Sequence, residues 1–346
     1  MKRMNSADIA RLAGVSRSTV SRVINNYPNV PDETRQRVMK VIKENHYYPQ
    51  LCGQMLNGTK SRTIGLFWVS RASIALDPLS SSYFMNIVDA ATAHDYLVLS
   101  CILDNLTDAR NVQFVRRVFM EGRIDAGIFI GANNSDPLLV ELLEAGEIIG
   151  VFDYYQEQPV PNCITANFER CSGEKAVDYL YGLGHRRIAF IDGDLNRLSC
   201  LDRHESFIRG MLKHGLSIRS DWMVFGGITQ TPGYQATRRL LENARGDLPT
   251  AIFATNDAVA FGVYQACREL GLSIPGDISV IGVDGHINDT HIDPPLTTIA
   301  FDFRRMFSSL VARIIDAIDQ KEGVETVAFH DGTLCERASC CPPRSR

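Results

Sequence analysis

The sequence lacks the short motifs that mark the common classes of enzyme. It has no Gly-x-Gly-x-x-Gly after an expected strand, no phosphate-binding loop, no His-Glu-x-x-His and no Gly-x-Ser-x-Gly. The eight histidines are scattered, and His185 lies in a Gly-His-Arg turn that looks structural. Asp192 and Asp194 could pair, but no nucleophile lies near them in the sequence, so we interpret them as turn residues. These absences predict that the chain is not an enzyme and binds no cofactor or metal.

Paired cysteines and long apolar runs are missing as well. None of the nine cysteines forms a Cys-x-x-Cys pair, and Cys340 and Cys341 are simply adjacent. An odd, scattered set is typical of a reducing cytosol rather than of a disulfide framework. No apolar run is long enough for a secretion signal at the start or for a membrane span elsewhere. We therefore expect a cytoplasmic protein with no membrane partner.

The composition is that of a soluble globular protein with an uneven distribution of charge. A chain of 346 residues suggests two or three domains, and 45% of the residues are hydrophobic. The first 60 residues contain ten Lys or Arg and four Asp or Glu, which leaves 26 basic against 36 acidic residues in the remainder. A basic head on an acidic body favours a polyanionic partner at one end only.

The basic head begins with a pattern for two short helices joined by a tight turn, between Asn5 and Asn26. Asn5 or Ser6 can cap the first helix, Gly14 can end it in the left-handed conformation, and Ser16 can cap the second. The apolar positions are Ile9, Ala10, Leu12 and Ala13 in the first helix and Val20, Val23 and Ile24 in the second. The second helix would leave Arg17, Ser18, Ser21 and Arg22 exposed. Such a helix suits the DNA major groove, although a helical hairpin with a solvated basic face is the alternative.

From Thr63 onward, expected strands alternate with expected helices. The strand-like runs cover 63–69, 96–102, 126–131 and 147–153, and then 186–193, 222–227, 250–255 and 278–284. The helical stretches are Tyr83–Ala93, Asp108–Met120, Pro137–Ala145, Gly173–Leu183, His204–His214, Gly233–Asn243 and Asp257–Leu270. This alternation predicts parallel sheets with helices on both faces, and the two series predict two similar lobes.

The head resembles the lactose-repressor (LacI/GalR) family of bacterial transcription regulators. The resemblance rests on AGVSRSTVSRVIN, a third helix between Pro31 and Asn45, and YYPQLCGQMLNG. The later blocks GLGHRRIAFI, TAIFATNDAVAFGV, DISVIGVDG and PPLTTI extend it over nearly the whole chain. The family's fold is a small all-α helix-turn-helix head plus an α/β periplasmic-binding-protein-like core of two doubly wound lobes. It implies a homodimeric, sequence-specific DNA-binding regulator, a repressor controlled by a small-molecule effector.

The resemblance also divides the chain. Residues 1–48 would form the DNA-binding domain and residues 49–61 the hinge helix and linker. The first lobe would comprise 62–162 plus 293–321 and the second 163–292 plus 322–346, with crossings near Asn162, Asp293 and Lys321. Leu56 would be the wedge that two subunits insert into the minor groove of a pseudo-palindromic double-stranded operator. The residues implied in DNA binding are Ser6, Ser16, Arg17, Ser18, Thr19, Ser21, Arg22, Asn25 and Leu56.

An effector is expected between the lobes, at the carboxyl ends of strands. Asp153, Asn256 and Asp284 follow strands and Arg203 starts a helix, and the resemblance places the last three at the effector. Asp257 is expected to cap the helix beside it. Three aromatic residues, Tyr83, Phe84 and Phe301, could stack on a ring or pack in the core.

The identity of the effector depends on chemistry that the family resemblance leaves open. A carboxylate and a guanidinium can each span vicinal hydroxyls, so we expect a sugar. A phosphoprotein or a purine corepressor is the alternative within the family, and a solute-binding module or a doubly wound enzyme lies outside it. The chain departs from the family in a long segment between Trp68 and Ser82 and in Ala166-Asn167, where the family has Asp-Asn.

Overall fold

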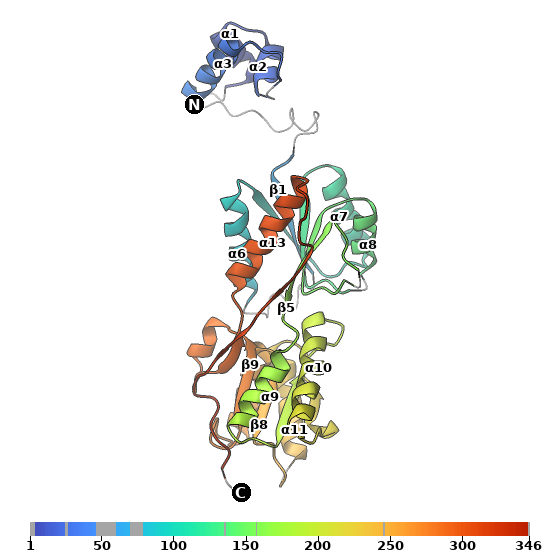
Figure 1. Ribbon diagram of the computed structural model, residues 1–346, viewed down its shortest axis with the longest axis vertical. Helices are drawn as coiled ribbons and strands as arrows, with labels where there is room; N and C mark the ends of the chain where they lie inside the picture. Colours follow the sequence, from blue (N-terminus) through green and yellow to red (C-terminus); the bar gives the residue numbers. More distant parts are fainter. Residues whose placement is uncertain are drawn as a thin grey trace. The chain divides into compact units, whose positions relative to one another are not determined.

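The computed structural model describes residues 4–24, 27–45, 60–69, 79–134, 136–156, 158–244 and 246–344. The chain divides into two compact units, Met1–Ser61 and Arg62–Arg346 (Figure 1). Within the described ranges, no helix has the length and apolar character needed to cross a membrane.

The first unit is a three-helix bundle of α1 (Ser6–Ala13), α2 (Arg17–Ile24) and α3 (Asp32–Glu44). Asn5 caps α1 by accepting from the amides of Ala7 and Asp8, and Gly14 ends it at φ 65°. The buried core is formed by Ile9, Ala10, Ala13, Val20, Val23, Val30 and Val38. Leu12 is 53% exposed, so its expected place in this core is wrong. It lies roughly 100° around the helix from the middle of the buried face.

The first lobe of the second unit is built on a six-stranded parallel sheet in the order β11-β5-β4-β3-β1-β2. Its strands are β1 (Thr63–Val69), β2 (Leu97–Leu103), β3 (Ala126–Ile130), β4 (Ile149–Phe152), β5 (Cys163–Phe168) and β11 (Val327–His330). One face is covered by α6 (Ser80–Ala93) and α13 (Phe303–Ile318), and the other by α7 (Ala109–Met120) and α8 (Pro137–Glu144) (Figure 1).

The second lobe repeats this plan with the order β12-β10-β9-β8-β6-β7, in which only β12 runs antiparallel to its neighbour. Its strands are β6 (Ile188–Asp192), β7 (Met223–Phe225), β8 (Ala251–Ala254), β9 (Ser279–Asp284), β10 (Thr297–Ala300) and β12 (Thr333–Cys335). The covering helices are α9 (Ser172–Gly182) and α10 (Leu198–Lys213) on one face and α11 (Gln230–Asn243) and α12 (Asp257–Glu269) on the other. Short 3-10 turns occupy Ser220–Trp222 and Ile287–Thr290.

The chain crosses between the lobes later than the sequence predicted. Strand β5 belongs to the first sheet, β10 to the second and β11 to the first. The crossings therefore follow Phe168, Ala300 and His330, and the expected positions at Asn162, Asp293 and Lys321 are wrong. Polar residues such as Thr165 and Thr298 interrupt these short strands and yet are fully buried, so a search for apolar runs misses them.

The turn that follows β9 is held by buried carboxyl groups. The sequence predicted that Asp257 caps α12, and this is wrong. The capping residue is Asn256, whose side chain accepts from the amide of Val259 at 2.8 Å. Asp257 instead accepts from the amides of Gly285 at 2.7 Å and His286 at 3.1 Å and from the hydroxyl of Thr298 at 2.7 Å. It therefore fixes the chain immediately after Asp284.

A second carboxyl group, that of Asp289, is fully buried beside Asp257. Burial, together with the neighbouring Asp289, raises the pKa of Asp257 well above its usual value. Burial raises the pKa of Asp289 to about 7, against the opposing effect of Arg337, whose guanidinium lies 3.6 Å from the carboxylate. The folded protein thus retains a proton that the unfolded chain releases.

This proton makes stability dependent on pH. Between the ordinary value of 3.8 and about 7, the folded state binds more protons than the unfolded state, so the free energy of unfolding should fall as pH rises. One proton corresponds to at most about 1.4 kcal/mol per pH unit. Asp289→Asn keeps the shape without the titration and should flatten this part of the stability curve, measured by urea unfolding from pH 4.5 to 7.5. The exposed Asp331→Asn serves as control, and parallel curves for Asp289→Asn and the parent protein would contradict the assignment.

Candidate nucleic-acid interface and effector cleft

The exposed face of α2 carries the residues expected to contact DNA. The hydroxyl of Ser16 accepts from the amide of Thr19 at 3.0 Å, which confirms the predicted cap, and it lies 2.7 Å from the hydroxyl of Ser18. The Nε of Arg17 donates to the hydroxyl of Ser6 at 3.3 Å, which links α2 to the start of α1. The exposed members of the predicted set are Ser16, Arg17, Ser18, Ser21 and Arg22. Asn25, Leu56 and the hinge segment 49–59 lie outside the described residues.

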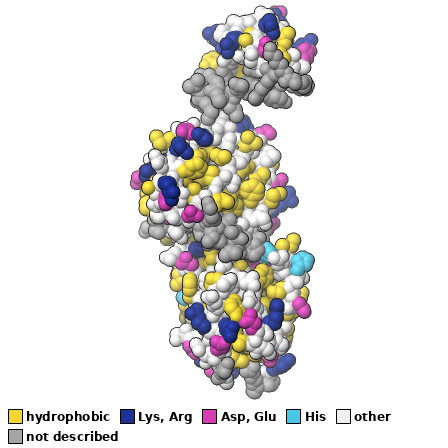
Figure 2. Space-filling model, turned by 180° about the vertical axis from the view of Figure 1, so that it is seen from behind, with side chains coloured by type: hydrophobic (Ala, Val, Ile, Leu, Met, Phe, Trp, Pro, Cys, Tyr) yellow, Lys and Arg dark blue, Asp and Glu magenta, His cyan; other side chains and the backbone are white. Residues whose placement is uncertain are grey.

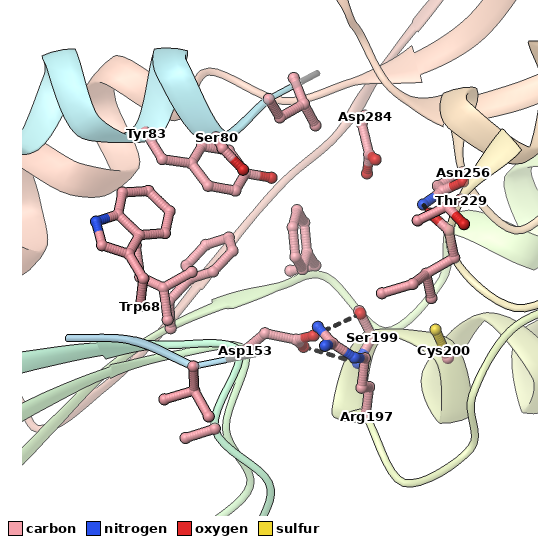
Figure 3. Close-up of a pocket in the computed structure, with 18 of the residues that line it drawn as sticks. Trp68, Ser80, Tyr83, Asp153, Arg197, Ser199, Cys200, Thr229, Asn256 and Asp284 are labelled. Carbon is pink, nitrogen blue, oxygen red and sulfur yellow. Dashed lines mark hydrogen bonds between the residues drawn. The ribbon is translucent and has the colours of Figure 1, made fainter. Parts of the chain in front are cut away.

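In the second unit, a cleft separates the carboxyl ends of the strands of the two lobes. Its cavity volume is about 90 Å³, within about 860 Å³ of atom-free space that includes open solvent. Trp68 and Tyr83 lie on one wall, and Asp284, Asn256 and Thr229 lie on the wall that faces them (Figure 3). Its other lining residues include Ser80, Phe152, Asp153, Phe168, Arg197, Ser199, Cys200, Arg203 and Ile228. Five of the seven predicted effector residues, Tyr83, Asp153, Arg203, Asn256 and Asp284, are thus brought together.

A buried ion pair forms the floor of the cleft in the second lobe. Arg203 is 4% exposed, and its guanidinium donates to Asp284 Oδ1 at 3.0 Å and to the carbonyl of Thr255 at 2.7 Å. The guanidinium also lies 5.0 Å from the ring centre of Phe168, which comes from the first lobe. Burial opposes the charge of Arg203, but the nearby acidic groups, chiefly Asp284, raise its pKa above the ordinary value. The guanidinium of Arg203 therefore stays positively charged beside the cleft.

Asp153 connects the two lobes directly. Its carboxylate accepts from the amide of Ser199 at 2.7 Å and from the hydroxyl of Ser199 at 2.6 Å (Figure 3). Asp153 follows β4 of the first lobe, whereas Ser199 lies in the first turn of α10 in the second. Arg197, the N-cap residue of α10, makes no side-chain capping bond. The carboxylate of the opposite lobe therefore satisfies the amino end of this helix.

Phe84 and Phe301, the other two residues in the prediction, are not among the cleft-lining residues. Phe84 follows Tyr83 on α6, about 100° around the helix, and is 37% exposed on another face. Phe301 is buried, with its ring 4.8 Å from that of Phe168 in an edge-to-face arrangement. Tyr83 lines the cleft and also packs on Phe303 at 4.9 Å. Phe301 is therefore a core residue, whereas Tyr83 both lines the cleft and packs in the core.

Several cleft residues have no counterpart in the sequence prediction: Trp68, Ser80, Arg197, Ser199, Cys200 and Thr229. Arg197, Ser199 and Cys200 belong to the first turn of α10, and Thr229 is the N-cap residue of α11. Burial raises the pKa of the Cys200 thiol to about 11, so this cysteine is a neutral apolar wall at neutral pH. These residues could have been found from their position in the fold, because the helix starts that follow strands lie together at this edge of the sheet.

Comparison with known proteins agrees with this architecture. Residues 7–50 match the model for bacterial regulatory proteins of the lacI family, and residues 177–340 match a periplasmic binding protein-like domain. The chain is 33% identical to the HTH-type transcriptional repressor PurR of Erwinia tasmaniensis over 96% of its length and 95% of the relative's. It is 31% identical to the repressor PurR of Pasteurella multocida, with coverage of 91% and 92%.

The solved structures lead to the same family. The lac repressor dimer bound to operator and the anti-inducer ONPF aligns with a TM-score of 0.79 and 26% identity, over 98% of this chain and 100% of that one. The resemblance and the fold class predicted from the sequence are both confirmed. The chain belongs to the lacI family of bacterial regulatory proteins, with a helix-turn-helix head and a two-lobed periplasmic-binding-protein-like core.

Proposed function

We propose that this protein is a homodimeric transcription repressor whose operator affinity is set by a small molecule bound between its lobes. The observation that carries the proposal is the cleft. There, the buried guanidinium of Arg203 in the second lobe faces Asp153 of the first lobe, whose carboxylate already accepts a hydrogen bond from Ser199 of the second lobe. A ligand placed there contacts both lobes, so it can favour one arrangement of them over another.

The DNA partner is a double-stranded, pseudo-palindromic operator read by α2 in the major groove. Arg17 and Ser18 lie in the first turn of α2, where a recognition helix meets base edges, and both are exposed. A guanidinium can bond in bidentate fashion to guanine, while hydroxyls and other cations bind phosphates and set the register. This proposal also places the protein in the cytoplasm, and the eight described cysteines are all free thiols.

The effector we propose is a sugar. The cleft presents two carboxylates, a guanidinium and an amide, in Asp153, Asp284, Arg203 and Asn256, beside the aromatic ring of Tyr83. Such groups suit a ring with hydroxyls on its edge and an apolar face. A purine is the second candidate, because the aromatic rings of the cleft, Trp68 among them, would also receive a flat base. A ligand screen must therefore contain both.

A homodimer is supported by apolar side chains on the first lobe. Strand β2 lies at the edge of its sheet, and Leu97, Leu99 and Ile102 are 69%, 37% and 53% exposed. Met85 on the neighbouring helix α6 is 64% exposed. Figure 2 shows hydrophobic side chains gathered over one face of this lobe. An exposed edge strand of this kind is usually covered by a partner, and a second copy of the chain is the partner we propose.

Arg17 should determine sequence preference rather than general affinity. Arg17→Ala removes a bidentate contact with a base, so it should cost about 1–3 kcal/mol on the preferred operator and little on variants at that base pair. Arg17→Lys is the matched control, because it keeps the charge and loses the planar fork. It should lose the preference but keep the salt dependence of binding. Operators selected from a random library, measured by fluorescence anisotropy, provide the test. An unchanged ranking of operator variants with Arg17→Ala would rule out this role.

Asp284 and Arg203 should be needed for the effector response but not for operator binding. A coupling of about 1–3 kcal/mol, a 5- to 150-fold change in operator affinity, is typical of such switches. Asp284→Asn and Arg203→Ala should abolish this change for whichever sugar or purine stabilises the parent in a thermal-shift screen. Ligand-free operator affinity should stay within about twofold, and the response of Asp331→Asn should match that of the parent. Melting curves identify any variant that has lost its fold. If both variants fold and respond like the parent, the cleft is not the effector site.

A further inference from the structure

The cleft does not end at the effector residues described above. We call the space between Tyr83 and Asp284 the inner chamber. A second hollow, the outer chamber, is lined by Asp104, Asn105, Leu106, Asn133, Asp136, Asp194, Phe225, Gly227 and Pro232. The two share Val69, Gly131, Arg197, Ile228 and Thr229 as walls. The cavity volume of the outer chamber is about 490 Å³. The two chambers therefore adjoin along these five residues.

The strand orders place the outer chamber at the far edge of both sheets. Asp104 follows β2 and Phe225 ends β7, and these are the last strands of the two sheets. The strands that lead to the crossings, β5 with β11 and β10 with β12, lie at the opposite edges. Both chambers thus lie along the same row of carboxyl ends, where open α/β sheets bind their ligands. The second hollow is a continuation of the binding edge.

Phe225 gives the outer chamber an aromatic surface. It is 64% exposed although it ends a strand of the sheet, so its ring contributes little to the core. The other lining residues include the amides of Asn105 and Asn133 and the carboxylates of Asp104 and Asp194, together with apolar side chains such as Leu106 and Pro232. Apolar surface with hydrogen-bonding groups in the same hollow suits a ring that is apolar on its face and hydroxylated on its edge.

The charged side chains of the outer chamber restrict the class of ligand further. Three carboxylates, those of Asp104, Asp136 and Asp194, line the outer chamber against one guanidinium, that of Arg197. Two of them are occupied in part: Asp136 accepts from the amide of Asn133 at 2.7 Å, and Asp194 accepts from the backbone and side-chain amides of Asn196 at 3.1 and 2.9 Å. A phosphate in this chamber would face like charge, whereas hydroxyl groups could donate to the carboxylates.

Arg197 lies where the two chambers meet and is half-buried. Within the described part of the chain, no hydrogen bond or ion pair joins its guanidinium to another residue. Among those residues its N–H donors have no partner, and their planar fork can reach acceptors on two connected groups of a ligand. This arrangement differs from that of Arg203, whose guanidinium is already committed to Asp284 and Thr255.

We propose that the effector is a neutral molecule of two linked rings. One ring occupies the inner chamber between Tyr83 and Asp284, and the second, bearing hydroxyl groups, occupies the outer chamber against Phe225. Arg197 binds acceptors near the linkage. This inference rests on the proposed effector function of the cleft and narrows its ligand class. A disaccharide and a nucleoside both have this chemistry, whereas a monosaccharide, a free base and a nucleotide do not.

The test measures binding to the full-length protein by thermal shift and calorimetry. With a fused purine counted as one ring system, the one-ring probes are glucose, galactose, adenine, guanine and hypoxanthine. The two-ring probes are cellobiose, maltose, lactose, adenosine, guanosine and inosine, and the charged probes are the three 5′-monophosphates and glucose 6-phosphate. At least one two-ring probe should bind tenfold or more tightly than its one-ring component, and its phosphorylated form should bind more weakly. Whether the bound probes are disaccharides or nucleosides separates the two sources.

Phe225→Ala tests the outer chamber itself. It should weaken the two-ring probe about tenfold and leave the one-ring component within twofold. Phe329→Ala is the matched control, because Phe329 is 45% exposed on β11 and does not line either chamber, and it should change neither affinity. Asp104→Asn should relieve the discrimination against phosphate without changing the affinity of one-ring probes.

The outcomes separate the inference from the function on which it rests. If a one-ring probe binds as tightly as its two-ring form and shifts operator affinity, the outer chamber is not a subsite, and the proposed function stands. Equal weakening of both probes by Phe225→Ala would also overturn the inference. If no probe of either size binds or changes operator affinity, both the inference and the proposed effector function fail.

Discussion

The cleft depends on one buried positive charge. Arg203 is almost inaccessible to water, so its guanidinium must be satisfied by groups that the fold brings to it. These groups come from three strand ends: Asp284 at the end of β9, the carbonyl of Thr255 after β8, and the ring of Phe168 at the end of β5. Asp284 has a φ of 124°, a conformation that non-glycine residues rarely adopt, and its bond to Arg203 and the anchored turn behind it hold it there. The position of the charge thus specifies the geometry of the site.

The bond between Asp153 and Ser199 gives the two lobes a means of communication. When the lobes separate, the amino end of α10 loses its cap, which consists of two charge-assisted hydrogen bonds. A cap is worth about 0.5–2 kcal/mol, which is comparable to the coupling energies of allosteric proteins. A ligand that replaces or reinforces this cap therefore acts on the lobe equilibrium with an energy of the right size.

The sequence predicted the architecture better than the details of the cleft. The helix-turn-helix, the alternation of strands and helices, and the residues after β4, β8 and β9 follow from local patterns that tertiary structure does not override. The start of α10 did not, because it was expected at His204 and lies at Leu198. The carboxylate that caps it belongs to the opposite lobe, so the sequence near Leu198 contains no capping residue that would predict the helix start. Arg197 and Ser199 were missed for this reason. Phe84 was expected at the cleft beside Tyr83, but adjacent residues of a helix point about 100° apart, so the two cannot both face it.

Two glycines that do not line the cleft determine where the cleft helices lie. A Cβ atom at Gly173 of α9 would lie 2.4 Å from the carbonyl oxygen of Arg203 and 2.4 Å from the amide nitrogen of Phe207. A Cβ atom at Gly262 of α12 would lie 2.4 Å from the carbonyl oxygen of Gln230. Backbone therefore rests on backbone in both helix pairs, with no flexible side chain between them to absorb a change. One added methyl group must displace a whole helix and, with α10, both Ser199 and Arg203. The positions of cleft residues are consequently sensitive to mutation at glycines that do not line the cleft.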